Sequence, residues 1–367
     1  MIFFSISLGI LYAILLIYLS FAWKKYFLSP QKINFRNNTM ISVIICCRNE
    51  IENLPELLKS LNNQSLTNEK YEIIVVDDHS TDQSYQYLYE NTKDYTNFRI
   101  LKQDENLQGK KLAFLKGIHH SNGNFIVTTD ADCIVSNNWL LCIYNQLIST
   151  NNQMILAPVF YKINEKKQIF SSVLALENLS LQALTASMCI LKRPIMSNGA
   201  NMGFSKINEA DINLKVPTGD DIFRLIWYKK EIGTENIIYL KDKECYVETD
   251  SPKTWQEFMN QRLRWASKTR QIKDKDVLGI GIFFSLINTT LAILPILSFL
   301  DKEYVMSYIL LLTLKMIGDY SLIFSFSAFY NKTKVLNYFI LVTIIYPYYF
   351  IIFAFLSQIR KYRWKGR

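Results

Sequence analysis

The chain has 367 residues, a mean hydropathy of +0.06 and a formal net charge of +9, and this length accommodates a domain of ordinary size with further segments. The excess positive charge comes from two short flanks without acidic residues, which makes a nucleic-acid-binding surface unexpected and favours contact with anionic lipid headgroups. The flanks contain Lys24, Lys25, Lys32 and Arg36 in one and Arg360, Lys361, Arg363, Lys365 and Arg367 in the other.

Residues 2–22 contain no charged side chain and are long enough to cross a bilayer. A cleavable signal peptide is the alternative, but it needs positive charge before the apolar core and small residues after it. Here Trp23, Lys24 and Lys25 follow the core. We therefore expect an uncleaved anchor, and the positive-inside rule places the domain that follows it in the cytoplasm.

Short apolar runs alternate with helical patterns in the first half of the chain. The runs cover residues 42–47, 71–76, 98–102 and 124–129, and the helical patterns cover 54–61, 83–91 and 110–119. Strands that are rich in β-branched residues and nearly continuous in apolar character are typical of a parallel sheet buried on both faces. The predicted fold class is α/β, with a mostly parallel sheet and helices on both of its faces.

A polar cluster follows three of the predicted strands: 48–50, 77–82 and 130–132. An Asp pair after one strand is typical of a turn or a helix cap, but ligands of open parallel sheets bind beyond the carboxyl ends of the strands. Three clusters at that edge therefore indicate a binding site. Because the sequence has no glycine-rich phosphate loop, phosphate would be held by a metal ion, by side-chain cations, or by both. Asp130 and Asp132, one residue apart, suit Mg²⁺ or Mn²⁺.

Two later segments allow more than one interpretation. Residues 168–191 form a long helical pattern with one charge, Glu177, and are either a core helix or a helix against the bilayer. Asp220 and Asp221 precede a helical pattern at 222–230; they either cap that helix or supply a general base for an incoming hydroxyl. Between these segments, residues 197–204 contain small side chains that would let the chain pass close to a ligand.

A helix is also predicted over residues 255–270. Gln261, Arg264 and Trp265 share one face of it, because they are spaced at i, i+3 and i+4, whereas Arg262 and Lys268 lie off that face. Arg and Gln can donate to phosphate oxygens, and the Trp ring offers a flat surface for a sugar. The alternative is a juxtamembrane helix with an interfacial Trp, and the two interpretations are compatible.

Three apolar stretches, 278–300, 304–329 and 335–356, come last. Three full crossings from a cytoplasmic domain would place the basic tail outside, against the charge rule, so one stretch is expected to enter and return. The first, which contains Pro295, and the second are the candidates. Lys315 and Asp319 in the second are predicted to form an intramembrane ion pair rather than a catalytic pair.

The predicted organisation is that of a multi-pass protein of the cell (inner, cytoplasmic) membrane. Its segments are an anchor at 1–23, a basic linker at 24–40, the domain at 41–250, an interface helix region at 251–277, membrane helices at 278–357 and a basic tail at 358–367. The six cysteines show no metal-ligand spacing, and we expect reduced thiols that serve for packing.

Seven motifs over residues 41–266 together resemble membrane-bound family 2 glycosyltransferases of the GT-A fold, a group that includes cellulose, hyaluronan and chitin synthases and ceramide glucosyltransferases. SVIICCRNE resembles the family's opening strand, IIVVDDHSTD its nucleotide-contacting Asp motif and GKKLAFLKGI the segment beside the diphosphate. TTDADC resembles its D-x-D metal motif, GANMGF its acceptor-side loop, TGDD its base motif and QRLRW its Q-x-x-R-W signature.

The resemblance implies a role for each matching residue. Asp132, with Asp130, would hold Mg²⁺ or Mn²⁺. Asp221 would be the general base, with Asp220 as the alternative, because the family usually has Glu-Asp where this chain has Asp-Asp. The implied substrate-binding residues are Arg48, Glu50, Asp77, Asp78, Lys110, Asp130, Asn201, Gln261, Arg264 and Trp265. No role is expected for His119, for His120 or for His79, which stands where the family more often has a small residue.

By the same resemblance the enzyme would be a metal-dependent, inverting hexosyltransferase. It would move a sugar from a nucleotide donor, expected to be a UDP-sugar, to a lipid-linked or membrane-embedded acceptor in envelope glycolipid or polysaccharide synthesis. A processive polysaccharide synthase is the alternative, although three or four crossings would not easily form a wide channel. A catalytically silent assembly subunit would be expected to lose a metal or base carboxylate, and this chain retains them. The large non-membrane domain disfavours a transporter.

Overall fold

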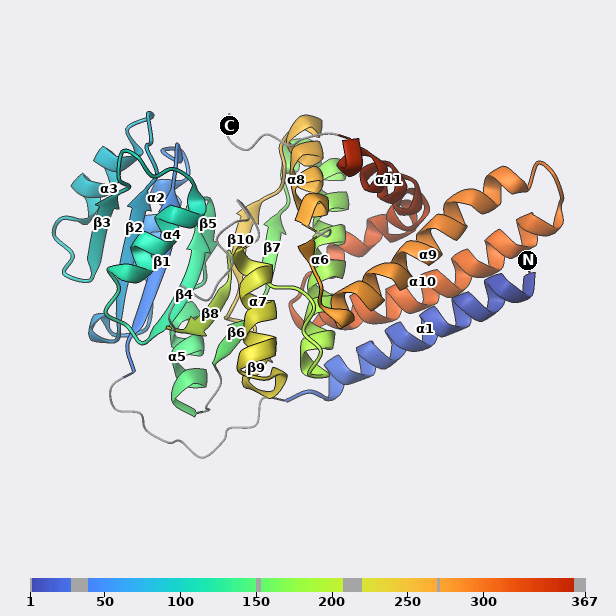
Figure 1. Ribbon diagram of the computed structural model, residues 1–367, viewed down its shortest axis with the longest axis horizontal. Coiled ribbons are helices and arrows are strands. Elements are labelled where there is room, and N and C mark those ends of the chain that lie inside the picture. Colours follow the sequence, from blue (N-terminus) through green and yellow to red (C-terminus); the bar gives the residue numbers. More distant parts are fainter. Residues whose placement is uncertain (1, 28–38, 150–152, 207–219, 269–270, 360–367) are drawn as a thin grey trace. The chain divides into compact units, whose positions relative to one another are not determined.

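The computed structural model describes residues 2–27, 39–149, 153–206, 220–268 and 271–359 (Figure 1). The chain forms two compact units. The first contains Met1–Tyr26, Tyr161–Ile195 and Ser251–Arg367, and the second contains Phe27–Phe160 and Met196–Asp250. Lys32, Arg36, Thr218, Gly219 and the basic tail from 360 to 367, all of which the sequence analysis singled out, lie outside the described residues.

The second unit is organised around a seven-stranded sheet in the order β3-β2-β1-β4-β8-β6-β9. Neighbouring strands run parallel, except that β8 is antiparallel to both β4 and β6. The strands are β1 (Ile41–Cys47), β2 (Tyr71–Asp77), β3 (Phe98–Lys102), β4 (Phe125–Asp130), β6 (Met154–Leu156), β8 (Met202–Ser205) and β9 (Ile237–Tyr239). The predicted α/β class with a mostly parallel sheet is confirmed.

The described part of this unit contains five α-helices: α2 (Leu54–Asn62), α3 (Ser84–Thr92), α4 (Lys110–His119), α5 (Trp139–Ser149) and α7 (Asp220–Glu231). A second, three-stranded sheet has the order β5-β10-β7. Its strands are β5 (Cys133–Val135), β10 (Val247–Asp250) and β7 (Val159–Lys162). Short 3-10 turns occur at η1 (Asn68–Lys70), η2 (Glu165–Lys167), η4 (Thr234–Asn236) and η6 (Thr333–Tyr338).

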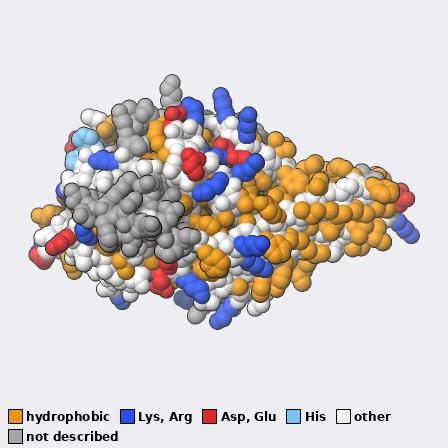
Figure 2. Space-filling model, turned by 90° about the horizontal axis from the view of Figure 1, so that it is seen from below, with side chains coloured by type: hydrophobic (Ala, Val, Ile, Leu, Met, Phe, Trp, Pro, Cys, Tyr) orange, Lys and Arg blue, Asp and Glu red, His pale blue; other side chains and the backbone are white. Residues whose placement is uncertain are grey.

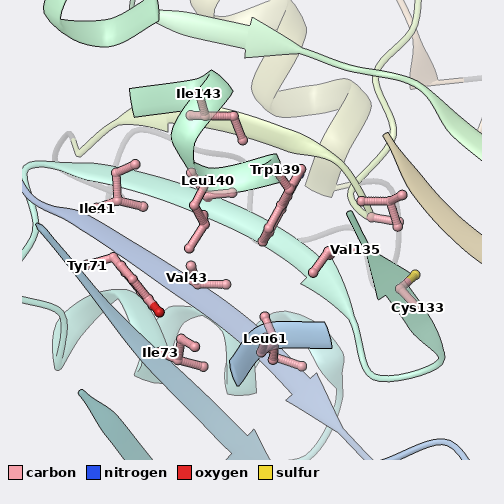
Figure 3. Close-up of a cluster of buried hydrophobic side chains, with 14 of the residues drawn as sticks. Ile41, Val43, Leu61, Tyr71, Ile73, Cys133, Val135, Trp139, Leu140 and Ile143 are labelled. Carbon is pink, nitrogen blue, oxygen red and sulfur yellow. The ribbon is translucent and has the colours of Figure 1, made fainter. Parts of the chain in front are cut away.

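Helices cover the main sheet on both faces, because alternate residues of a strand point to opposite sides. Ile41, Val43 and Ile45 of β1 belong to a buried cluster with residues of α2 and α5. Figure 3 shows part of this cluster, with Trp139 and Leu140 of α5 above the strands. Ile44 points the other way and lies against α4, where a Cβ added to Gly117 would be 2.6 Å from its side chain.

The first unit consists mainly of long helices: α1 (Ile2–Lys25), α6 (Gln168–Ile190), α8 (Trp255–Lys268), α9 (Lys275–Leu297), α10 (Glu303–Phe329) and α11 (Phe339–Ile359). Five helical segments in the described part of the chain are long and apolar enough to cross a membrane; they contain α1, α6, α9, α10 and α11. Hydrophobic side chains cover the long helices on the face that Figure 2 shows.

The helix α6 differs from the other candidate spans because most of its side chains are buried within the protein. It contacts α1, α10 and α11, so protein rather than lipid surrounds it. Of the two interpretations of residues 168–191, the structure favours the core helix. The core in question is that of the first unit, whereas the sequence analysis placed this segment within the 41–250 domain.

Polar contacts join α1 to α10. The hydroxyl of Tyr12 donates to Asp319 Oδ1 at 2.6 Å, and Asp319 also pairs with Lys315. Lys315 is buried. The predicted ion pair in this helix is therefore confirmed, and its carboxylate additionally accepts a hydrogen bond from the N-terminal helix.

The two stretches considered for a re-entrant path are both continuous helices. Pro295 lies two residues before the end of α9, and α10 runs without interruption from Glu303 to Phe329. None of the six cysteines forms a disulfide in the described residues, and Cys47, Cys133, Cys189 and Cys245 are buried.

Candidate active site

The carboxyl ends of three parallel strands bring the predicted polar clusters together. In the register of the sheet Cys47 pairs with Asp77, and Cys46 pairs with Asp130. The residues that follow β1, β2 and β4 therefore leave the sheet at the same edge. The sequence analysis expected the three polar clusters at one sheet edge, beyond the carboxyl ends of these strands, and the register agrees with that expectation.

Asp78 is the centre of the hydrogen bonds at this edge. Its carboxylate accepts from the backbone N–H of Gly109 at 3.1 and 3.2 Å, and its Oδ2 lies 3.7 Å from Arg48 Nη1. Its own N–H donates to the carbonyl of Cys47 at 2.8 Å. Asp78 is almost fully buried, so it fixes the loops after β1, β2 and β3 relative to one another.

The neighbouring Asp77 has one carboxylate oxygen that is bonded within the described residues and one that is not. Its Oδ2 accepts from the N–H of Ser80 at 3.2 Å. Its Oδ1 is buried and has no hydrogen-bond partner in the part of the chain that the structure describes. A buried carboxylate oxygen without a donor is costly, and a donor on a bound nucleotide would remove that cost.

Lys110, at the first residue of α4, reaches the end of β4. Its Nζ lies 2.6 Å from Asp130 Oδ1. The preceding Gly109 has φ of 114°, a conformation that side-chain-bearing residues rarely adopt. A glycine is therefore required where the chain turns into α4 and presents Lys110 to Asp130.

Asp132 lies in the turn that follows β4, between Ala131 and Cys133, and its side chain is exposed. In the described residues, no three His, Cys, Asp or Glu side chains come together as a metal site. Mg²⁺ in phosphate-transfer sites takes one or two carboxylates and completes its shell with phosphate oxygens and water. Asp130 and Asp132 fit that donor set.

Cys133, next to Asp132, has a buried thiol. Burial, together with the nearby carboxylates of Asp132 and Asp130, raises the pKa of its thiol well above the ordinary value. The thiol remains protonated at neutral pH and lies 3.7 Å from Asp132 Oδ1 as a weak donor.

Asp221 reaches the same sheet edge through Gly199. A Cβ added to Gly199 would lie 3.8 Å from the Cβ of Asp221. The carbonyl of Gly199 accepts from Thr128 Oγ1 at 2.6 Å, and Thr128 is two residues before Asp130 in β4. Asp221 thus lies near Gly199, which is hydrogen-bonded to β4 two residues before the predicted metal ligand Asp130.

The helix α7 is held in place by two residues that the sequence analysis did not consider. The buried guanidinium of Arg224 lies 4.1 Å above the ring of Phe204 in β8 and 5.3 Å from the ring of Phe114 in α4. The hydroxyl of Tyr228 donates to the carbonyl of Ser205 at 2.5 Å. Asp220 and Asp221 begin this helix, where the helix dipole stabilises negative charge.

The interpretation of Asn201 as a substrate contact is not supported. Its side chain is 1% exposed. Its Oδ1 accepts from Trp139 Nε1 at 2.9 Å, and its Nδ2 donates to the carbonyl of Pro158 at 2.8 Å. Asn201 therefore joins core elements. The neighbouring Gly203 also has a packing role, because a Cβ there would be 2.5 Å from the ring of Phe125.

Glu50 and His79 occupy structural positions at the same edge. The carboxylate of Glu50 accepts from Asn53 Nδ2 at 2.6 Å, immediately before α2. His79 has φ of 61°. This left-handed conformation favours glycine, although His is one of the residues found there more often than most. Its Nδ1 lies 3.1 Å from Asp78 Oδ1.

The remaining predicted site residues lie in α8, within the first unit. Gln261 Nε2 donates to the hydroxyl of Tyr161 at 3.1 Å, and Gln261 Oε1 accepts from Arg262 Nη1 at 3.0 Å. Arg264 and Trp265 are both half-buried. The helical spacing that places Gln261, Arg264 and Trp265 on one face is confirmed, since all three lie within α8.

Arg262 is the residue in this motif whose importance the sequence analysis missed. It is buried, pairs with Glu177 of α6 at 2.6 Å, and its guanidinium lies 4.8 Å from the ring of Phe258 and 4.5 Å from that of Trp265. Burial disfavours the charged guanidinium, but Glu177 outweighs this effect and raises the pKa of Arg262. The sequence feature that could have indicated this role is Glu177, the one charge in an apolar helix, because a buried acid requires a partner.

Comparison with known proteins agrees with this geometry. Residues 42–211 match the family model described as glycosyl transferase family 2. The chain is 36% identical over 100 residues to glycosyltransferase AglE of Haloferax volcanii, a match that covers 27% of this chain and 33% of that protein. It is 30% identical over 102 residues to a β-monoglucosyldiacylglycerol synthase of Nostoc sp., covering 28% of this chain and 22% of that protein.

The chain thus matches a third or less of the length of these two relatives. A solved structure extends the similarity in fold to nearly the whole chain. The mannosyltransferase PcManGT of Pyrobaculum calidifontis, in complex with GDP-Man and Mn²⁺, has a TM-score of 0.56 at 14% identity and covers 97% of this chain and 98% of its own. The GT-A-like α/β fold is thereby confirmed, and the match to the glycosyl transferase family 2 model extends over residues 42–211.

Proposed function

We propose that the protein is an inverting glycosyltransferase that moves a sugar from a nucleotide donor to a membrane-embedded or lipid-linked acceptor. The observation that supports this proposal is that Asp77, Asp78, Lys110 and Asp130 lie at one edge of the sheet, within the residues that match the family 2 model. A nucleotide requires a hydrogen-bond acceptor, a diphosphate requires positive charge, and an attacking hydroxyl requires a base, for which we propose Asp221.

The donor is held by the residues that follow β1, β2 and β4. Asp77 accepts a hydrogen bond from the nucleotide through its buried Oδ1, and Arg48 and Asp78 shape the loop that surrounds it. Lys110 contacts the diphosphate. The donor is expected to be a UDP-sugar, and the GDP-Man bound by the mannosyltransferase from Pyrobaculum calidifontis makes GDP-sugars the first comparison.

Asp132 and Asp130 would hold a divalent cation, which would supply positive charge to the leaving diphosphate. The two-carboxylate donor set fits Mg²⁺ or Mn²⁺, and the mannosyltransferase of similar fold is described with Mn²⁺. Asp130 is paired with Lys110 at 2.6 Å, so the ammonium group of this lysine also lies against the carboxylate.

Asp221 is the general base. It takes the proton from the acceptor hydroxyl while the hydroxyl oxygen forms a bond to the anomeric carbon and the bond from that carbon to the diphosphate oxygen breaks. Lys110 takes up part of the negative charge that develops on the diphosphate. The roles that the resemblance implies for Gln261, Arg264 and Trp265 stay predictions. Attack on the face opposite the leaving group inverts the configuration of the sugar.

A lipid acceptor is supported by two observations. Several helices of the first unit are long and apolar enough to span a membrane, and the relative from Nostoc sp. is named for a glucosylated diacylglycerol. With the basic flank after α1, the positive-inside rule places the family 2 domain in the cytoplasm. Analysis of product length on a gel separates a single transfer from the alternative, a processive polysaccharide synthase.

Activity of the full-length protein in detergent tests the proposal. The protein is incubated with radiolabelled UDP- and GDP-sugars, a membrane lipid extract and Mg²⁺ or Mn²⁺. We expect one donor to be consumed, EDTA to stop the reaction and added Mn²⁺ to restore it, with Asp132→Asn as the matched variant that no metal rescues. Absence of turnover with every donor would refute the transferase, whereas turnover unaffected by EDTA and by Asp132→Asn would refute the metal site alone.

A further inference from the structure

A cavity of about 430 Å³ lies in the first unit, apart from the residues discussed above. It is bounded by α1, by the C-terminal end of α6 and by the first turns of α9. Its walls are largely apolar and include Leu15, Leu19, Met188 and Ile280. The volume is within the range of about 300–1,000 Å³ that is usual for small-molecule sites. Apolar walls between helices able to span a membrane suit a hydrocarbon chain.

Charged side chains also line this cavity. Arg193 and Lys275 are joined there by Asp276, so two cations and one carboxylate give the lining a net charge of +1. Arg193 Nη1 lies 3.4 Å from Asp276 Oδ1. Because a guanidinium has five N–H donors, Arg193 can keep this contact and still donate to a phosphate. The charges therefore favour an anionic group at the polar side of the cavity.

The position of the cavity along α1 matches the depth of a lipid chain. Leu15 and Leu19 come six to ten residues before Lys25, which at 1.5 Å per residue is about 9–15 Å of helix. Lys24 and Lys25 end α1 and are placed at the level of the headgroups. Tyr18, which also lines the cavity, is 57% exposed, as is usual for aromatic residues near the membrane surface.

We propose that this cavity binds an anionic phospholipid of the surrounding bilayer. One acyl chain lies against Leu15, Leu19, Met188 and Ile280, and the headgroup phosphate lies between Arg193 and Lys275. The net positive lining selects a headgroup with net negative charge over a zwitterionic one, whose ammonium group it repels. The test of this site does not depend on the proposed transferase activity, because lipid binding is measured without turnover.

Two glycines of α9 provide a matched pair of variants. Gly279 lines the cavity, and a Cβ added there would meet nothing within 4 Å. A leucine at this position would therefore enter the space proposed for the lipid chain, and its Cβ would meet no protein atom within 4 Å. A Cβ at Gly281 also meets nothing within 4 Å, but this residue does not line the cavity.

Native mass spectrometry of the full-length protein tests the site. The protein is reconstituted in vesicles of phosphatidylcholine mixed with phosphatidylglycerol, and the lipids that remain bound after release are identified. We expect the wild type and Gly281→Leu to retain phosphatidylglycerol in preference to phosphatidylcholine, and Gly279→Leu to lose it. Lys275→Gln and Arg193→Gln should each weaken retention about fivefold, the effect of about 1 kcal/mol for one basic residue near a membrane surface.

Two results would overturn the proposal. Equal retention of phosphatidylglycerol by Gly279→Leu and Gly281→Leu would show that the lipid binds elsewhere, and equal retention of the two phospholipids by the wild type would remove the charge selection. A third arm adds an isoprenyl phosphate to the same vesicles. Its displacement of phosphatidylglycerol from the wild type, but not from Gly279→Leu, would assign the cavity to a lipid-phosphate acceptor instead.

Discussion

At the scale of single residues, Asp221 is the proposed general base, so we expect turnover to depend on it more than on any other side chain. Its carboxylate accepts from the N–H of Ile222 at 2.9 Å, and its helix is anchored through Arg224 and Tyr228. Asp221→Asn keeps the shape and the hydrogen-bond acceptor but removes the base. We expect turnover to fall by about 10²–10⁴ while nucleotide affinity is unchanged, as measured by kcat and by calorimetric titration of the donor nucleotide.

Asp220→Asn is the control for this prediction, since the two carboxylates are adjacent in sequence and only one of them is proposed to act. This variant should retain most of its turnover. If Asp220→Asn were inactive and Asp221→Asn active, the assignment of the base would be reversed.

The location of a single residue could be predicted from the sequence where its side chain had only one plausible role. Asp77 and Asp130 lie at the sheet edge as predicted, because strand ends and charged side chains are visible in the sequence. Asn201 was not placed correctly, because a polar side chain in a loop looks the same whether it faces a ligand or, as here, the indole N–H of Trp139. That distinction depends on α5, a helix that the sequence analysis did not identify.

At the scale of elements, the buried ion pair between α6 and α8 orients the helix that carries Gln261. Both side chains of the Arg262–Glu177 pair are less than 10% exposed. Removing one partner leaves an uncompensated buried charge, which typically costs about 3–5 kcal/mol. We expect Arg262→Gln and Glu177→Gln each to lower the thermal unfolding temperature in detergent substantially.

The double variant Arg262→Gln/Glu177→Gln tests whether the two side chains stabilise the protein as an ion pair or independently of each other. When both charges are absent no unpaired charge remains, so the double variant should be less destabilised than the sum of the single variants. Additive losses would show that the two residues do not act as a pair.

The larger elements follow from the sequence, but the short ones do not. β1 to β4 and the helices α2 to α4 match the predicted ranges within one or two residues, because long apolar runs and their polar ends are strong signals. β5, β6 and β9 have three residues each, too few for an alternation of side chains to be recognised. The antiparallel direction of β8 likewise depends on its partners β4 and β6 rather than on its own residues.

At the scale of the whole molecule, the first unit is assembled from segments at both ends of the chain. α1 and α10 approach closely at Gly318, where an added Cβ would lie 3.1 Å from the Cα of Ala13 and 3.3 Å from the Cβ of Leu16. Small residues permit such approaches between membrane helices. Gly318→Leu should therefore destabilise the protein by about 1–3 kcal/mol through overpacking, measured as a lower melting temperature in detergent.

Gly281→Leu is the matched control, because its Cβ would be in open space. Its melting temperature should equal that of the wild type. A melting temperature for Gly318→Leu that also matched the wild type would mean that α1 and α10 are not in close contact.

The division into units was only partly predictable. The apolar stretches identified α1, α9, α10 and α11 as candidate spans. The sequence placed residues 168–191 in the 41–250 domain, whereas α6 packs with α1, α10 and α11. Hydropathy reports how apolar a helix is, and it does not report which other helices surround it.

The hydrogen bond from Tyr12 to Asp319 joins residues 307 positions apart, and this separation has a consequence during biosynthesis. A ribosome adds about 5–20 residues per second, so α1 exists for roughly 15–60 s before α10 has been translated. Throughout that interval the hydroxyls of Tyr12 and Ser20 lack the partners that α10 supplies. Until α10 has been translated, α1 can therefore bind helices of other nascent proteins or the membrane-insertion machinery.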